Sequence, residues 1–235
     1  MPTIIRGQPT SEEVLIKLAS LHEPVFLSFS CGKDSTAAWI AMHEYEIPVL
    51  PVYFYVVPGL EIVQESILFF EEYFCQKIAC YPHPSLYRML EANVYQPPNR
   101  LHVLDNAQLP VPDLSMMWDE IRSDYGLKNA WIADGVRASD SIVRRASLTK
   151  HGVMKYHSHK VSPIADWLKE DVMNCLNKHN VKLPVDYELW GRTLDGLDAR
   201  FTSKLKERFP QDYETIKAFF PLVELDLLRR KTYGI

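Results

Sequence analysis

The stretch VFLSFSCGKDST, residues 25–36, decides the fold of this chain. Residues 25–29 are a short apolar run after Pro24, as expected for a strand buried on both faces. From residue 36 to residue 45, small and apolar residues recur at helical spacing, so the polar turn between them joins a buried strand to a helix. This arrangement predicts the opening of a βαβ unit, in which helices connect parallel strands.

The same alternation continues along the chain. Further strands are predicted at residues 48–57, 77–81, 129–134 and 161–167. Helices are predicted at residues 14–21, 60–74, 86–92, 114–125, 166–179, 197–209 and 212–220, followed by a terminal amphipathic stretch. Residues 93–112, rich in Pro, Asn and Gln, are expected to form a loop. The pattern predicts an α/β fold with a doubly wound, mostly parallel five-stranded sheet. We expect residues 1–165 to form this domain and residues 166–235 a helical extension packed on it.

Composition narrows the class of protein. The chain has 235 residues, 47% of them hydrophobic and 24% charged, with a net charge of −4, which is typical of a globular domain and disfavours nucleic-acid binding through overall basicity. It contains neither an apolar run long enough to span a membrane nor an N-terminal signal-peptide pattern, so we expect a cytoplasmic protein without membrane contact. Its four cysteines, Cys31, Cys75, Cys80 and Cys175, form no clustered pattern, which predicts no iron–sulfur cluster.

The turn at residues 30–36 has the composition of an anion-binding loop. In a parallel sheet, ligands bind at the carboxyl ends of the strands, where helix N-termini present unpaired N–H groups. Gly32 allows a ligand to approach the backbone, Lys33 adds a positive charge, and hydroxyl donors are supplied by Ser30, Ser35 and Thr36. A Walker nucleotide loop would need glycine where Leu27 stands, so that class of loop is excluded.

A second loop, residues 135–141, follows the fourth predicted strand and should end beside the first. Gly135 allows a tight exit from the strand, and the planar guanidinium of Arg137 suits phosphate oxygens. Arg144 lies about one helical turn beyond Ser141 and could converge on the same anion. For Arg144 and Arg145, an ordinary solvated basic surface is the alternative interpretation.

Both loops resemble one family. Residues 30–35 resemble the Ser-x-Gly-Lys-Asp-Ser loop of the PP-loop ATP pyrophosphatase superfamily (adenine nucleotide α-hydrolase-like, with a HUP or Rossmann-like fold). Residues 135–144 resemble the Gly-x-Arg-x-x-(Glu/Asp)-Ser-x-x-Arg motif of its phosphoadenosine-phosphosulfate (PAPS) reductase-like branch. Residues 59–61 and 163–167 match further family segments, and the resemblance covers about residues 20–192. The chain departs from the family at Cys31, usually glycine, and at residues 57–58, usually Asp-Thr.

The resemblance implies a binding site for ATP, or a PAPS-like adenylyl nucleotide, together with Mg²⁺. It implies nucleotide contacts from Ser30, Cys31, Gly32, Lys33, Asp34, Ser35, Thr36, Gly135, Arg137 and Ser141. Lys33 and Ser35 would hold the pyrophosphate and Asp34 the metal, while Arg137 and Arg144 would stabilise transition-state charge. With Lys33, Asp34, Arg137 and Arg144 as catalytic residues, the implied reaction is attack by an acceptor on the α-phosphate, releasing pyrophosphate.

The missing cysteines leave three functions open. PAPS reductases carry a cysteine in a C-terminal segment, and residues 228–235 of this chain contain none. An AMP-forming enzyme is the leading hypothesis, with a role in nucleic-acid or sulfur-linked modification. A non-catalytic nucleotide-binding or nucleic-acid-associated subunit is the second, and a PAPS reductase that uses Cys31 is the third. Cys31 is either a reactive thiol at a helix start or a small replacement for glycine.

One segment bears on binding partners. Residues 136–160 contain six Lys and Arg residues against one acid, Asp140, although the whole chain is acidic. A basic segment beside the expected site leaves a nucleic acid open as a partner, as well as a partner protein or a homodimer.

Overall fold

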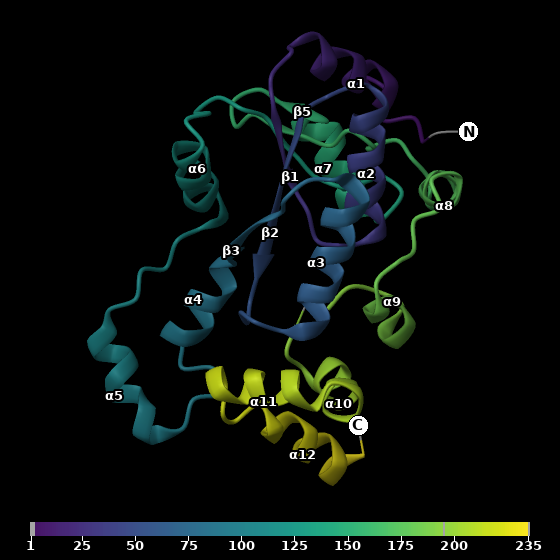
Figure 1. Ribbon diagram of the computed structural model, residues 1–235. Helices are drawn as coiled ribbons and strands as arrows, with labels where there is room; N and C mark the ends of the chain where they lie inside the picture. Colours follow the sequence, from purple (N-terminus) through teal and green to yellow (C-terminus); the bar gives the residue numbers. More distant parts are fainter. Residues whose placement is uncertain (1–2, 195, 235) are drawn as a thin grey trace. The chain divides into compact units, whose positions relative to one another are not determined.

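The computed structural model describes residues 3–194 and 196–234, and strands and helices alternate through the first part of this range (Figure 1). The strands are β1 (Val25–Ser28), β2 (Val49–Tyr55), β3 (Ala79–Pro82), β4 (Ile132–Ala133), β5 (Met154–Lys155) and β6 (Lys160–Val161). The helices are α1 (Ser11–Ser20), α2 (Lys33–Glu44), α3 (Glu61–Phe74), α4 (Pro84–Glu91), α5 (Pro98–Ala107), α6 (Leu114–Asp124), α7 (Ile142–His151), α8 (Lys169–Lys178), α9 (Val185–Trp190), α10 (Ala199–Arg208), α11 (Pro210–Phe219) and α12 (Glu224–Tyr233).

The sheet has the strand order β3-β2-β1-β4-β6-β5. Strand β1 pairs in parallel with β2 on one side and with β4 on the other, and β4 pairs in parallel with β6. The chain therefore builds the sheet outward in both directions from β1, which is the doubly wound arrangement, and the order reverses between β1 and β4. The predicted α/β class with a mostly parallel sheet is confirmed.

The predicted number of five strands is wrong, because the described residues form a six-stranded sheet. The additional strand, β5, pairs antiparallel with β6, with Met154 opposite Val161 and Lys155 opposite Lys160. A strand of two residues is too short to show a period of two in the sequence, so it is recognisable only through its partner.

Strand β1 and helix α2 lie in the core, as the burial of their residues shows. Val25, Phe26 and Leu27 are at most 1% exposed, and every residue of α2 from Ser35 to Met42 is buried. A helix that is buried on all sides needs cover on several faces, and α2 packs against both β1 and α8. The α2 N-terminus is thereby held rigidly at the carboxyl end of β1.

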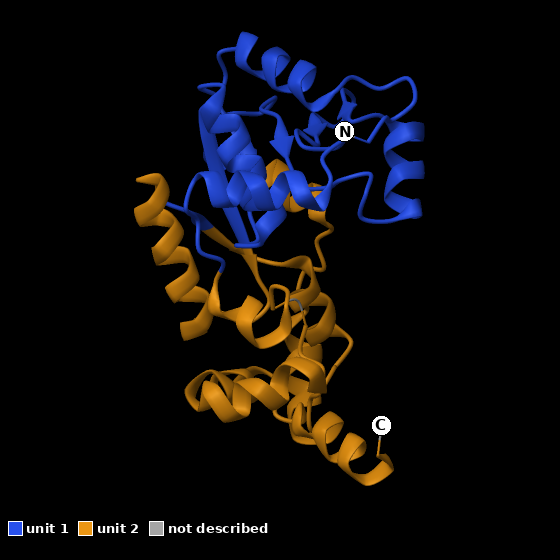
Figure 2. Ribbon diagram, turned by 90° about the vertical axis from the view of Figure 1, so that its right-hand side faces the viewer, with its two compact units in different colours: residues 1–53, 77–79, 122–183 blue, residues 54–76, 80–121, 184–235 orange. Residues whose placement is uncertain are grey.

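The chain divides into two compact units (Figure 2). Unit 1 comprises residues 1–53, 77–79 and 122–183, and unit 2 comprises residues 54–76, 80–121 and 184–235. The expected domains, residues 1–165 and 166–235, stay a prediction. In unit 2, α3 and α4 share one apolar core with α10 and α11, formed by Leu60, Ile62, Leu86, Leu205, Ile216 and Phe220 among others. The C-terminal helices therefore form a unit with residues from the middle of the chain.

Three helices were not predicted. Helix α5 lies within residues 93–112, which we expected to be a loop, and it has no buried residue. A helix without a buried face has no apolar periodicity, so the sequence gives no signal for it. Helix α7 buries only Leu148, and α9 is just six residues long. Among the described residues, no helix is both long and apolar enough to cross a membrane.

Candidate active site

The first loop directs the N-terminus of α2 toward the carboxyl end of the sheet. Cys31 has φ = 56°, in the left-handed region, and Gly32 is the N-cap of α2 without a capping side chain. The first N–H groups of α2 are therefore not capped by the side chain of the N-cap residue, which is the arrangement that favours an anion. A left-handed residue other than glycine costs about 1 kcal/mol, so the turn at Cys31 carries a backbone cost that glycine would not have.

Hydroxyl groups of the first loop stabilise its own backbone. Ser35 Oγ donates to the Gly32 carbonyl at 3.0 Å and accepts from the Ser30 N–H at 3.3 Å. Thr36 is fully buried, and its Oγ1 donates to the same carbonyl at 2.9 Å. Ser35 and Thr36 are thus part of the framework that shapes the loop, and their role as nucleotide ligands stays a prediction.

Gly135 brings the second loop into direct contact with the first. A Cβ atom at Gly135 would lie 2.7 Å from the Asp34 carbonyl carbon and 2.7 Å from the Ser35 nitrogen. Both are backbone atoms of the first turn of α2, so neither can move without shifting the helix. Only glycine allows the β4 exit to pass this close to α2.

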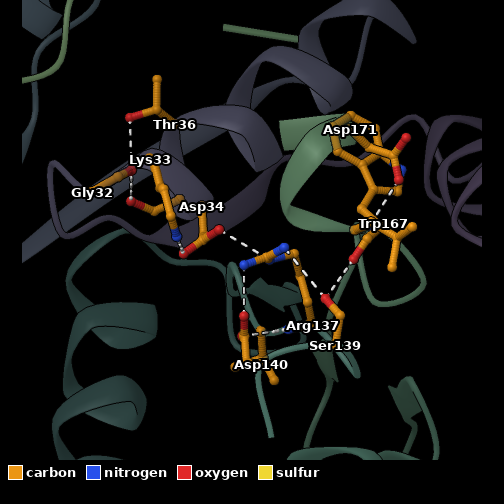
Figure 3. A network of polar contacts seen from close by, with 12 residues as sticks. Gly32, Lys33, Asp34, Thr36, Arg137, Ser139, Asp140, Trp167 and Asp171 are labelled. Atoms are coloured by element: carbon orange, nitrogen blue, oxygen red, sulfur yellow. Dashed lines mark hydrogen bonds and ion pairs between the residues drawn. The ribbon is translucent and has the colours of Figure 1, made fainter. Parts of the chain in front are cut away.

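A chain of ion pairs connects the two loops (Figure 3). Lys33 Nζ lies 2.5 Å from Asp34 Oδ2, and Arg137 Nε lies 3.0 Å from Asp34 Oδ1. Arg137 Nη2 also contacts Asp140 Oδ1 at 2.6 Å, and Asp140 Oδ2 is 2.6 Å from Arg144 Nη1. Three cations and two carboxylates therefore alternate across the site, which leaves one positive charge in excess.

Arg137 is the most buried charged group in this chain of ion pairs. Its side chain is 4% exposed, compared with 52% for Arg144. The separation of Arg137 Nε from Asp34 Oδ1 is an ion-pair distance, yet both atoms lack a hydrogen bond of acceptable geometry. Such incompletely satisfied buried groups are uncommon in native proteins and mark a position where a ligand could complete the bonding.

Residues 163–167 accept hydrogen bonds from the second loop. The Ala138 N–H donates to the Ala165 carbonyl at 2.7 Å, and Ser139 Oγ donates to the Trp167 carbonyl at 2.8 Å (Figure 3). The Asp166 carboxylate accepts from the Ser11 N–H and hydroxyl at the start of α1. Residues 163–167 therefore hold the loop in place and connect it to α1.

Asp134 is not among the predicted site residues and occupies the position before Gly135. Its Oδ1 accepts hydrogen bonds from Ser162 Oγ at 2.7 Å and from the Val136 N–H at 3.1 Å. Burial raises the pKa of the Asp134 carboxyl above its ordinary value, although both hydrogen bonds and the charges of Lys155 and Arg144 act in the opposite direction. The signal available in the sequence was a carboxylate that ends an otherwise apolar strand, next to a glycine.

We expect Asp134→Asn to make the stability of the protein less dependent on pH. Because its native pKa is raised above the unfolded value, Asp134 destabilises the native state above that pKa, and the cost is relieved as the pH falls through it. Asparagine keeps an oxygen that can accept from Ser162 and Val136. In thermal unfolding, the variant should melt higher than the wild type at about pH 8, and the difference should shrink toward about pH 4.

Asp105→Asn is the matched control for this change, because Asp105 is exposed and its substitution removes the same charge outside the site. A constant difference between Asp134→Asn and the wild type at every pH would contradict a raised pKa at Asp134.

The predicted site residues thus fall into two groups. The structure brings together Gly32, Lys33, Asp34, Ser35, Gly135, Arg137 and Arg144, the last through Asp140. Ser141 is exposed and accepts from the Arg144 N–H as the N-cap of α7, and Cys31 is 3% exposed. The geometry of the loops depends on Ser141, Cys31, Ser30 and Thr36, whose contact with a nucleotide stays a prediction.

Asp34 is the carboxylate best placed for a metal ion. Among the described residues, no three His, Cys, Asp or Glu side chains gather into a metal site. Mg²⁺ does not need such a cage, because it commonly takes one or two carboxylates and completes its shell with water and substrate phosphates. Asp34, at the first turn of α2 with Oδ1 lacking a hydrogen bond, fits that donor set.

Comparisons with known proteins found a likeness in structure but not in sequence. No protein-family model and no curated protein matches the sequence. The chain is similar to a solved structure of the NH3-dependent NAD synthetase from Campylobacter jejuni subsp. jejuni NCTC 11168, in complex with the nitrate ion. The alignment covers 97% of each chain at 12% identity, with a TM-score of 0.45. At these values the likeness is loose, and we base the function on the geometry of the two loops.

Proposed function

We propose that this protein is an ATP-dependent enzyme of the PP-loop type, which forms AMP and pyrophosphate while activating an acceptor. The observation that carries the proposal is the contact between the two loops: Arg137, 4% exposed, lies 3.0 Å from Asp34 in the first turn of α2. A buried arginine aimed at the uncapped start of a helix provides two elements of a polyphosphate site in one place.

The residues of the ion-pair chain would divide the phosphates between them. The N–H groups at the start of α2 and the ammonium of Lys33 would bind the β- and γ-phosphates, which compete with Asp34 for Lys33. Arg137 would face the α-phosphate side, because it reaches Asp34 from the opposite loop. Arg144, half-exposed and bonded to Asp140, would add charge from the rim of the site.

The reaction is a displacement at the α-phosphate. A nucleophilic oxygen of the acceptor forms a bond to the α-phosphorus, and the bond from that phosphorus to the bridging oxygen of the β-phosphate breaks. Pyrophosphate leaves with the electron pair of the broken bond and takes the developing negative charge, while the acceptor stays bonded to the AMP group. AMP is released in a second displacement, in which an amine, ammonia or a sulfur nucleophile attacks the acceptor carbon and the bond from that carbon to the oxygen of AMP breaks. Positively charged donors fixed before the reaction stabilise that charge in the transition state, because they need no reorganisation.

Asp34 would hold Mg²⁺ together with phosphate oxygens of the nucleotide. When bound there, Mg²⁺ supplies charge neutralisation for the leaving pyrophosphate. A PAPS-like nucleotide would suit the same loops, but reduction by Cys31 has less support because that thiol is 3% exposed. We infer ATP as the substrate for this reason.

The test is to incubate the protein with Mg²⁺ and ATP labelled at the α-phosphate, with and without DNA or tRNA as an acceptor, and to measure bound ATP and labelled AMP. Lys33→Ala should lower AMP formation by about 10²–10³-fold, the usual cost of removing one group that stabilises transition-state charge. Lys128→Ala, an exposed lysine of the same unit, is the matched control and should keep wild-type activity.

Each outcome separates the open functions. AMP that depends on Lys33 supports the proposal, and stimulation by one polymer would identify the acceptor class. Formation of ADP would overturn it, because the β–γ bond would then be the one that breaks. ATP binding without any product would instead support a nucleotide-binding subunit, and sulfite release from PAPS that is lost in Cys31→Ala would support a reductase.

A further inference from the structure

The region that follows the second loop has basic residues and no acidic ones. Residues 142–160 contain Arg144, Arg145, Lys150, Lys155 and Lys160, three histidines and no acid, in a chain whose net charge is −4. These residues form α7, which begins directly after the second loop, and the β5–β6 hairpin. We call α7 and this hairpin together the basic face.

Helix α7 is almost entirely uncovered. Only Leu148 of its ten residues is buried, while Ile142 is 89% exposed and Val143 is 78% exposed. At 100° per residue, Val143 and Lys150 lie on the face opposite Leu148. A helix that is exposed on most of its surface gains little from packing in the protein itself, which favours a role in contact with a partner.

The hairpin places two positive charges directly opposite each other. Lys155 and Lys160 are cross-strand partners, and like charges in such a pair are destabilising. An anion from outside would relieve the repulsion between the lysines.

An aromatic ring lies in the same region. Tyr156, in the turn of the hairpin, is 56% exposed. Lys17 of α1 donates to its hydroxyl at 2.5 Å and lies 4.9 Å from the ring centre, which adds one more cation to this region. Exposed aromatic rings among basic side chains are typical of surfaces that bind nucleic acid, because bases stack on the rings while the cations contact phosphates.

We propose that the basic face binds the phosphate backbone of a nucleic acid, and that this nucleic acid is the acceptor of the reaction. The claim that this nucleic acid is the acceptor rests on the proposed function. A strand that lies along α7 is led toward Asp140 and Arg137, because α7 begins two residues after Asp140. A nucleic acid is favoured over an acidic protein because three of the five Lys and Arg residues are lysines, which are depleted in protein–protein interfaces.

The test measures binding to fluorescein-labelled single-stranded DNA and RNA of about 20 nucleotides by fluorescence anisotropy, without ATP, from about 50 to 200 mM salt. The variant is Arg145→Glu with Lys150→Glu, two exposed residues outside the ion-pair chain. The matched control is Arg229→Glu with Lys231→Glu, an equal change of charge on the exposed part of α12. Circular dichroism melting checks that both variants fold.

The wild type should bind with a dissociation constant that rises steeply with salt. The α7 variant should bind at least about tenfold more weakly, with a log–log salt slope smaller by about 1.4, from the loss of two phosphate contacts. The α12 control should bind like the wild type. No salt-dependent binding by the wild type, or equal weakening by both variants, would overturn the proposal, and so would stronger competition by poly-glutamate than by unlabelled DNA.

The same samples separate this proposal from the proposed function. Binding of ATP to the wild type and the α7 variant is measured by calorimetry. It should be equal because Arg145 contacts the second loop only through its backbone N–H, which bonds to the Ser141 carbonyl and is kept in the variant. If ATP fails to bind while the nucleic-acid result holds, the proposed function fails and the basic face stands. If ATP is converted to AMP but the α7 variant binds nucleic acid normally, only the basic face fails.

Discussion

Gly135→Ala is expected to destabilise unit 1 and to remove nucleotide binding. The new methyl group would lie 2.7 Å from two backbone atoms of Asp34 and Ser35, a separation that no packed structure tolerates. This clash is relieved only if the chain that follows β4 and the N-terminus of α2 move apart, which also separates Arg137 from Asp34. We expect a loss of about 2–3 kcal/mol in the free energy of unfolding and a melting temperature lower by roughly 5–10 °C.

Gly196→Ala is the matched control for this prediction. A Cβ there would meet its nearest neighbours, on Phe201 and Asp198, at 3.7–3.8 Å, which is ordinary van der Waals contact. Calorimetric unfolding and ATP binding should therefore be close to wild type for Gly196→Ala and strongly impaired for Gly135→Ala. Equal behaviour of the two variants would show that the close approach of the loops is not needed for folding or binding.

Arg137→Ala is expected to have a comparably large effect for an electrostatic reason. The substitution removes a buried cation that contacts two carboxylates, Asp34 at 3.0 Å and Asp140 at 2.6 Å. Those carboxylates then lie close together without the charge between them. Removing one partner of a buried pair typically costs about 3–5 kcal/mol, and we expect the lower end because Asp34 and Asp140 are 27% and 16% exposed.

Two further variants sharpen the Arg137 prediction. Arg137→Lys keeps the charge but lacks the planar fork that reaches both carboxylates, so it should recover part of the stability and little of the AMP formation. Arg145→Ala removes an exposed arginine nearby and should change the free energy of unfolding by less than about 0.5 kcal/mol. Urea unfolding and the AMP assay provide both readouts. Wild-type AMP formation by Arg137→Ala would rule out a catalytic role for this residue.

The first loop shows how far local sequence can predict structure. A buried apolar run, a polar turn with a glycine and a helical pattern from residue 36 predict a strand, a loop and a helix in that order. The structure has this order, with α2 beginning three residues earlier, at Lys33. Strand β5 and helix α5 show the limit, since one has only two residues and the other has no buried residue. Each lacks the periodicity from which an element can be predicted.

The division into units shows a different limit. The boundary expected at residue 165 assumed that neighbours in sequence pack together. In the structure, Leu60 and Leu86 share a core with Ile216 and Phe220, which lie more than a hundred residues further along the chain. Several apolar helix faces are complementary enough to pack against one another. Which of them meet is decided only when the whole chain has folded.

The sequence by itself determined the α/β class and the order of the strands and helices that have apolar periodicity, and with it the position of the two loops at the ends of β1 and β4. Those features depend on short-range properties: apolar periodicity, turn residues and the rule that parallel strands end at one edge. The tertiary structure decided the contact between Arg137 and Asp34, the burial that raises the pKa of Asp134, and the exposure of α7. These depend on distances and on burial, which arise only when segments far apart in the chain pack against one another.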